Sequence, residues 1–387
     1  MEFVELIEGA SLIENVHVYA PEDLGVNDLV LCYDKIVEIG KDLTALYPRT
    51  RKIDGRGLLA VPGFIDQHVH ITGGGGEGSF KTRVPPLRFT DCVQAGVTTL
   101  VGLLGTDGIT RSVEDLLAKT KALNEEGVTA YCLTGSYQYP SITLTGDVKK
   151  DIAFINEVVG VKIALSDHRC SHPTREDLIR LASDVRMASL ISGKPGLVTI
   201  HMGRGKGRLD LIFQILEETD IPIKHFRPTH VGKLGEAAVR FAKMGGYIDF
   251  TASSRPSEAA GDIVQAIQAG APLQRITLSS DANGSLPKWN EENEMIGITA
   301  ASMQSLHKVV TELIIGEGMP VTDALRLVTE NAAQALELDG RKGRLEAGYD
   351  ADLLLLDSEF HLDTVIARGQ VLMQGGELKV QDGIMLD

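Results

Sequence analysis

The chain has 387 residues, of which 43% are hydrophobic and 24% are charged. These proportions are ordinary for a globular protein, and the length favours one large barrel with a smaller unit beside it. The net charge of -15 argues against a nucleic acid partner, because that binding relies on Lys and Arg that neutralise phosphates. No stretch of 18 apolar residues occurs and the first residues are acidic, so we expect neither a membrane partner nor a signal peptide.

Both ends of the chain show short strand patterns separated by turn residues. Alternation such as Asp28-Leu29-Val30-Leu31 is typical of half-buried antiparallel strands. We expect residues 1–57 and 343–387 to form one small β-sandwich domain built from both termini. Its predicted strands are Ala10–Val18, Asp28–Tyr33, Lys35–Ile39, Ala351–Leu356, Val365–Arg368 and Gln370–Met373.

Residues 58–342 alternate between β-rich runs and helical patterns such as 111–126 and 173–192, the second opening with a capping-box-like Thr174-Arg175-Glu176-Asp177. Eight such strands alternating with helices predict an α/β fold, a (β/α)8 TIM barrel. No GxGxxG follows a strand, which disfavours a dinucleotide-binding sheet. The predicted barrel strands are Gly63–His70, Val97–Leu104, Thr129–Tyr137, Gly160–Ser166, Leu197–Met202, His225–Val231, Tyr247–Ala252 and Ile276–Ser280.

The four cysteines indicate a reducing compartment. They lie far apart and form no CxxC pair, at Cys32, Cys92, Cys132 and Cys170. Disulfide scaffolds are typical of short secreted chains, and free buried thiols are typical of the cytoplasm. We therefore expect a cytoplasmic protein.

Metal-ligating residue types gather at the carboxyl ends of the predicted barrel strands, where barrel active sites form. His68 and His70 are two apart and so share one side of a strand. Alone, this pair could simply bond backbone carbonyls. However, His201, His230 and Asp281 end three further strands. Imidazole and carboxylate ligands suit zinc, with iron, cobalt, nickel or manganese as alternatives.

Lys162 is a lone lysine inside the apolar strand Gly160–Ser166. It either reaches solvent from the outer face of the barrel or lies buried, where an unpaired ammonium is costly. A neutral buried amine beside two cations can take up carbon dioxide, and the resulting carbamate is an anion long enough to bridge them.

The HxH after Pro62-Gly63-Phe64-Ile65-Asp66, the strand lysine, the later single histidines and Asp281 resemble the pattern of the amidohydrolase superfamily. From end to end the chain is similar to the β-aspartyl (isoaspartyl) dipeptidases of that superfamily. The segments that carry this resemblance are 63–77, 101–107, 116–127, 159–169, 228–231 and 278–285.

The resemblance implies a binuclear site with two divalent ions, best fitted by Zn²⁺. One ion would be held by His68, His70 and Asp281, the other by His201 and His230. A carbamate on Lys162, derived from carbon dioxide, would bridge the ions together with the hydroxide that attacks the substrate. Asp281 would accept the proton of this hydroxide and pass it to the leaving amine.

The resemblance also implies how a β-aspartyl dipeptide is recognised. The loop Gly73-Gly74-Gly75-Gly76-Glu77 lets the backbone approach a ligand, and Gly75 and Glu77 would hold the aspartyl head; without the resemblance, a flexible loop with a solvated acid would be the simpler interpretation. Tyr137 would donate to the developing oxyanion and Arg169 would bind a carboxylate. Thr106 and Ser285 match smaller polar contacts, although either could cap a helix.

Lys233 departs from the family pattern, which has a second carboxylate-binding arginine at this position. Lysine keeps the charge but lacks the bidentate fork. This difference affects the strength and breadth of substrate binding rather than the reaction.

Two other kinds of function remain open. One is a cyclic-amide hydrolase, such as a dihydroorotase or hydantoinase, or an N-acyl amino acid deacylase. The other is a catalytically silent scaffold, which is disfavoured because all six metal positions are filled. The family resemblance also implies a homo-oligomer, with an octamer as the example.

Overall fold

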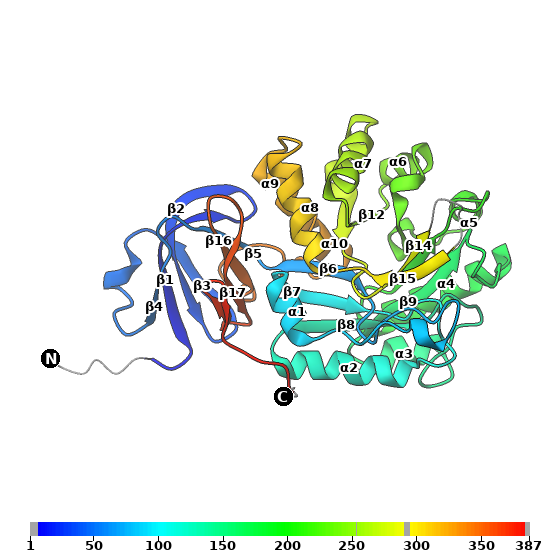
Figure 1. The fold of residues 1–387 in the computed structure, drawn as a ribbon, viewed down its shortest axis with the longest axis horizontal. Coiled ribbons are helices and arrows are strands. Elements are labelled where there is room, and N and C mark those ends of the chain that lie inside the picture. Colours follow the sequence, from blue (N-terminus) through cyan, green and yellow to red (C-terminus); the bar gives the residue numbers. More distant parts are fainter. Residues whose placement is uncertain (1–6, 253, 290–294, 384–387) are drawn as a thin grey trace.

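The computed structural model describes residues 7–252, 254–289 and 295–383. Within them, two large sheets lie side by side, and helices surround one of the two (Figure 1). The sheet that the helices surround has eight parallel strands, each paired with the next in chain order. They are β6 (Phe64–Val69), β7 (Val97–Gly102), β8 (Thr129–Gly135), β9 (Val158–Leu165), β10 (Leu197–Met202), β11 (Phe226–Thr229), β12 (Ile248–Thr251) and β13 (Ile276–Ser279).

The eight-stranded sheet closes on itself. A parallel bridge joins Val69, the last residue of β6, to Ala282, which lies three residues beyond β13. Below this bridge the buried carboxylate of Asp66 accepts hydrogen bonds from the backbone amides of His68 (3.2 Å) and Ser280 (3.1 Å). The predicted (β/α)8 barrel is therefore confirmed, and every predicted barrel strand overlaps an observed one.

Helices pack against the outside of the barrel through one continuous apolar core, which includes Leu116 of α2, Leu181 of α4 and Ile263 of α7. The helices are α1 (Phe89–Gln94), α2 (Val113–Glu126), α3 (Val148–Phe154), α4 (Arg175–Ser192), α5 (Asp210–Glu218), α6 (Glu236–Lys243), α7 (Pro256–Gln268), α8 (Gln304–Ile315), α9 (Val321–Arg326) and α10 (Glu330–Ala335). The predicted capping box of α4 is present, since the Thr174 hydroxyl accepts from the Asp177 amide (3.2 Å). Short 3₁₀ turns lie at Leu43–Ala45, Phe80–Thr82, Ile223–His225, Val231–Lys233 and Leu273–Arg275.

The second sheet has nine strands and takes them from both ends of the chain, as expected for the small β domain. Its strands are β1 (Ala10–Tyr19), β2 (Asp23–Cys32), β3 (Lys35–Gly40), β4 (Arg51–Asp54), β5 (Leu59–Pro62), β16 (Leu353–Leu356), β17 (Leu362–Ala367), β18 (Gln370–Gln374) and β19 (Glu377–Leu378). β5 pairs with both β1 and β16 and so joins the two ends. The domain boundaries at 57/58 and 342/343 stay predictions, although β5 lies beyond the first of them.

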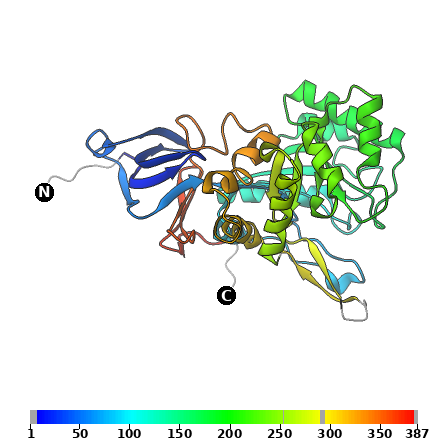
Figure 2. The same cartoon turned by 90° about the horizontal axis from the view of Figure 1, so that it is seen from above.

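A two-stranded hairpin, β14 (Ser285–Trp289) and β15 (Met295–Ala300), follows the last barrel strand and projects from the barrel (Figure 2). Its first residue, Ser285, lies four residues after Asp281. The hairpin therefore starts beside the carboxyl-terminal face, where the predicted site residues gather.

Candidate metal and active site

The predicted metal ligands all lie at the carboxyl-terminal face of the barrel. His68 is near the end of β6 and His70 follows this strand, while Lys162 and His201 lie within β9 and β10. His230 and Asp281 follow β11 and β13, with backbone φ angles of 62° and 54°. Positive φ is uncommon for residues other than glycine and is frequent at functional sites.

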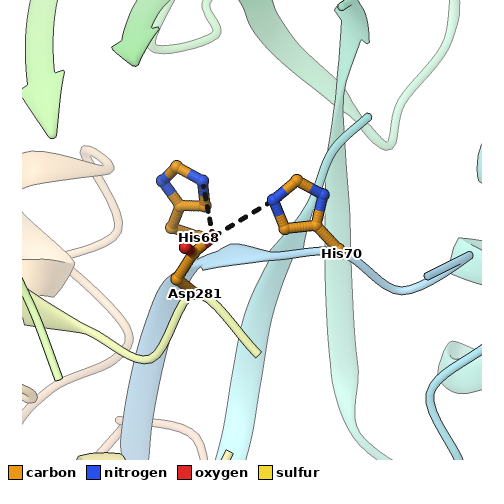
Figure 3. Close-up of side chains that lie close together, drawn as sticks. All are labelled: His68, His70 and Asp281. Atoms are coloured by element: carbon orange, nitrogen blue, oxygen red, sulfur yellow. Dashed lines mark ion pairs between the residues drawn. The ribbon is translucent and has the colours of Figure 1, made fainter. Parts of the chain in front are cut away.

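His68, His70 and Asp281 form a compact group whose candidate ligand atoms all lie within 4.8 Å of one another (Figure 3). Asp281 Oδ1 is 3.3 Å from His68 Nε2 and 3.1 Å from His70 Nε2. Among the described residues, Asp281 Oδ1 and both Nδ1 atoms are buried without a well-aligned hydrogen-bond partner. Asp281 Oδ1 and the Nε2 atoms of the two histidines, turned toward one another, are a ligand set that suits a divalent cation.

Lys162 points into the barrel beside this group rather than out to solvent. Its side chain is fully buried, and Nζ lies 3.1 Å from His68 Nε2. Burial lowers the pKa of Lys162 to about 7, so much of the amine is neutral at physiological pH. The side-chain direction fits the predicted bridging position; carboxylation of the amine stays a prediction.

His201 and His230 are brought together beside His68 but outside the His68–His70–Asp281 group. The His201 and His230 rings lie 4.6 Å apart, and those of His68 and His230 5.0 Å apart, between centroids. His230 Nδ1 is 2.6 Å from Thr251 Oγ1, a contact that fixes the ring and leaves Nε2 free to ligate. The assignment of these two histidines to a second metal stays a prediction.

His68, His201 and His230 are held in the neutral form that binds metals. Burial lowers the pKa of His201 to about 4, and burial places the pKa values of His68 and His230 well below their ordinary range. Asp281 behaves in the opposite way. Burial raises its pKa, but the close contacts with His70, His68 and His230 outweigh burial, so the pKa is lowered and the group stays a carboxylate.

Glu77 is the centre of a second polar group beside the histidines. Its Oε1 accepts hydrogen bonds from Thr106 Oγ1 (2.9 Å), Ser285 Oγ (3.0 Å) and Arg169 Nη1 (3.0 Å). Burial raises the pKa of Glu77, but these donors outweigh burial and leave the pKa below its ordinary value. Four residues predicted from distant parts of the sequence thus meet at one point.

The glycine loop before Glu77 is packed rather than open. Gly75 has a φ of 82°, and a Cβ at this position would lie 2.2 Å from the Thr82 carbonyl oxygen. The guanidinium of Arg111, which is buried, donates to the carbonyls of Thr72, Gly74 (3.1 Å) and Val84 (2.8 Å). Arg111 was not predicted as a site residue, since nothing in the sequence distinguishes it from a surface cation at a helix start.

Tyr137 is buried against the second pair of histidines. Its hydroxyl is 2.7 Å from His201 Nδ1, and burial raises the pKa of the phenol well above its ordinary value. The phenol therefore stays protonated and remains a hydrogen-bond donor.

Asp167 is a site residue that the sequence did not reveal. Its carboxylate is 3.0 Å from His201 Nε2 and accepts three hydrogen bonds from Arg169, two from the guanidinium (2.9 Å each) and one from the backbone amide (2.8 Å). The only signal was its place two residues after β9, in Ser166-Asp167-His168-Arg169. Lys233, in contrast, lies exposed in the turn after β11, and among the described residues no carboxylate is within ion-pair distance of it.

The model of the amidohydrolase family matches residues 59–372. A β-aspartyl dipeptidase from Fervidobacterium islandicum, solved in complex with β-Asp-Leu, is 41% identical, with 97% of this chain and 100% of that chain covered and a TM-score of 0.91. Another structure of β-aspartyl dipeptidase from the same organism has 40% identity, the same coverage and a TM-score of 0.89.

An adenine deaminase from Bacillus pumilus is 24% identical over 91% of this chain, and this chain spans 55% of the length of that deaminase. Separately, no helix in the described part of the chain is long and apolar enough to cross a membrane.

Proposed function

Because the chain belongs to the amidohydrolase family, we propose that it hydrolyses β-aspartyl (isoaspartyl) dipeptides in a binuclear metal site. The observation that carries this proposal is the Glu77–Arg169 group beside the histidine cluster. The aspartyl residue of such a dipeptide is linked through its side chain, so its α-ammonium and α-carboxylate are both free. Glu77 is an anion suited to the ammonium, and Arg169 is a guanidinium suited to a carboxylate.

The metal ions would be held by His68, His70 and Asp281 on one side and by His201 and His230 on the other, with Lys162 between them. The convergence of Asp281 Oδ1 with Nε2 of His68 and of His70 supports the first of these two sets. Bound there, divalent ions lower the pKa of water and polarise the scissile carbonyl. Zinc fits this set of nitrogen and oxygen donors.

The protein's own groups would position the substrate and move the protons. Asp281, kept ionised by the neighbouring histidines, accepts the proton of the attacking water and delivers it to the leaving amine. Tyr137, kept protonated by burial, donates to the oxyanion that forms at the carbonyl. Glu77, with Gly75 and Thr106 beside it, fixes the aspartyl head, so that the side-chain amide lies at the metal group.

The test is hydrolysis of β-Asp-Leu compared with α-Asp-Leu, with metal content measured on the same sample. We expect cleavage of the β-linked dipeptide alone, loss of this activity on chelation, and its return with zinc. Dihydroorotate, a hydantoin and adenine serve as competing substrates for the alternatives within the family. Turnover of one of these, with none of β-Asp-Leu, would contradict the proposal; a metal-loaded chain without activity on any of them would favour a scaffold.

A further inference from the structure

A cavity of about 460 Å³ lies between the loops that follow β9 and β10, next to the catalytic face. Asp167 lines it and also contacts His201 Nε2 at 3.0 Å, so the cavity adjoins the site. Cys170 also lines the cavity, and it packs against Tyr137 of the candidate site. Asp167 thus separates the cavity from His201, and Cys170 separates it from Tyr137.

The polar lining of the cavity is mainly basic. It includes the charged side chains of Lys206 and Arg208 and the imidazoles of His168 and His172. Asp167 is its carboxylate, and this carboxylate is already bonded to Arg169 and His201. Among the described residues no carboxylate lies within ion-pair distance of Lys206 or Arg208. In a chain with a net charge of -15, unpaired cations around a cavity favour an anionic ligand.

The loop that carries these cations is held in place. The Ser166 carbonyl accepts from the Gly205 amide (2.6 Å), and the Ser166 hydroxyl donates to the Arg208 carbonyl (3.1 Å). A Cβ at Gly203 would lie 2.3 Å from the Ser166 carbonyl oxygen, so a glycine is needed for this approach. Arg208 itself has a φ of 41°, an uncommon value for a residue with a side chain.

Arg208 also reaches toward the turn that carries Lys233. Its Nη1 is 3.4 Å from the carbonyl oxygen of Leu234, the residue after Lys233. The guanidinium of Arg208 therefore lies beside the turn that carries the exposed Lys233. It offers the fork geometry that a lysine lacks.

We propose that Arg208, with Lys206 beside it, binds the α-carboxylate of the amino acid that follows β-aspartate, in the substrate or after release. The apolar part of the cavity lining, Leu165, Pro173 and Leu211, would receive an apolar side chain of this amino acid. The inference rests on the proposed dipeptidase function and adds a carboxylate-binding residue to it.

The experiment compares β-Asp-Leu with β-Asp-leucinamide, which lacks the carboxylate. Arg208→Met keeps the apolar stem and removes the charge. In this variant we expect kcat/KM for β-Asp-Leu to fall about tenfold to a hundredfold, mainly because KM rises. The kcat/KM for β-Asp-leucinamide should not change. Arg208→Lys should restore part of the difference. Binding of free leucine, measured by calorimetry, tells whether the released amino acid uses the same cation.

Arg204→Met is the matched control, because Arg204 is exposed, lies in the same loop and is outside the lining of the cavity. If Arg208→Met lowered kcat/KM equally for β-Asp-Leu and β-Asp-leucinamide, the inference would be overturned. It would also be overturned if the variant changed neither the preference for β-Asp-Leu over the amide nor the binding of leucine. The same holds if Arg204→Met had the same effect as Arg208→Met. A metal-loaded wild type inactive on both compounds would instead overturn the proposed function itself.

Discussion

Two buried lysines, one at each side of the barrel, have opposite surroundings. Lys342 lies where the start of β8 meets the nine-stranded sheet, and its ammonium contacts Asp352, Asp350 (3.0 Å) and Thr129 Oγ1 (3.0 Å). Lys162 lies at the carboxyl-terminal side, where Nζ is 3.1 Å from His68 Nε2. Among the described residues, no carboxylate is within ion-pair distance of Lys162.

The two surroundings stabilise different forms of the amine: the charged form in Lys342, which stabilises the fold, and the neutral, reactive form in Lys162. A buried ammonium needs anions around it, and Lys342 has two. Lys162 instead contacts the imidazole of His68, and burial lowers its pKa to about 7. Its amine is therefore available as a nucleophile or as the precursor of a ligand.

The strongest test of this comparison is Lys162→Met. Loss of the bridging ligand should lower kcat/KM on β-Asp-Leu by about a thousandfold or more. The metal content should fall, and the circular dichroism spectrum should not change, because methionine fills a similar volume without a charge. A variant that kept full metal content and full rate would contradict the bridging role of Lys162.

Lys342→Met should act on stability instead of activity. It leaves the buried Oδ2 of Asp352 without its cation, which costs about 3–5 kcal/mol of unfolding free energy. Urea unfolding of the metal-loaded protein measures this loss. The folded fraction should keep the wild-type kcat, and a drop in kcat at equal metal content would mean that the two lysine environments are coupled.

The pH at which metal-free protein regains activity should report the pKa of Lys162. Only a neutral amine adds carbon dioxide, and in the folded chain the pKa falls from 10.5 to about 7. At a fixed carbon dioxide pressure, the initial rate of activation by zinc should rise about tenfold per pH unit below 7, with the fraction of neutral amine, and become level above it. A rise that continued toward pH 10 would show that Lys162 keeps the pKa of an exposed lysine.

Arg111 is a third buried cation, and it should give the smallest effect. It is satisfied by backbone carbonyls of the glycine loop rather than by carboxylates. Arg111→Met should loosen the loop that carries Glu77 and raise KM about tenfold, with kcat nearly unchanged. Arg111→Lys should recover part of the loss. Equal falls in kcat and kcat/KM would instead indicate a role in the transition state.

Most of the fold could be predicted because the signals were local and repeated. The apolar strand runs, the caps at Thr174 and Gly127 and the turns between strands each depend on short segments. The hairpin β14–β15 and the pairing of β5 with β16 were not predicted. Their partners are fixed by tertiary packing rather than by a pattern in their own sequence.

The candidate site was predicted less evenly. Histidines at strand ends are rare enough to be noticed, and Glu77 follows a run of four glycines. The inward direction of Lys162 depends on strand register, which the sequence alone does not fix. Asp167 and Arg208 could not be distinguished from surface charges, because their meaning comes from contacts with residues of other loops.

The parallel bridge between Val69 and Ala282 closes the barrel between its first and last strands. His68 and His70 belong to the β6 side of this junction and Asp281 to the β13 side. One cation held by all three would therefore stabilise the contact between the first and last strands. Closing so long a loop is entropically costly during folding, and a ligand that binds only the closed form shifts the equilibrium toward it. The metal concentration would then influence the rate of turnover and also the fraction of molecules in which the barrel is open between β6 and β13. Because the open form is the one exposed to proteases, the rate of proteolysis would rise as metal is removed.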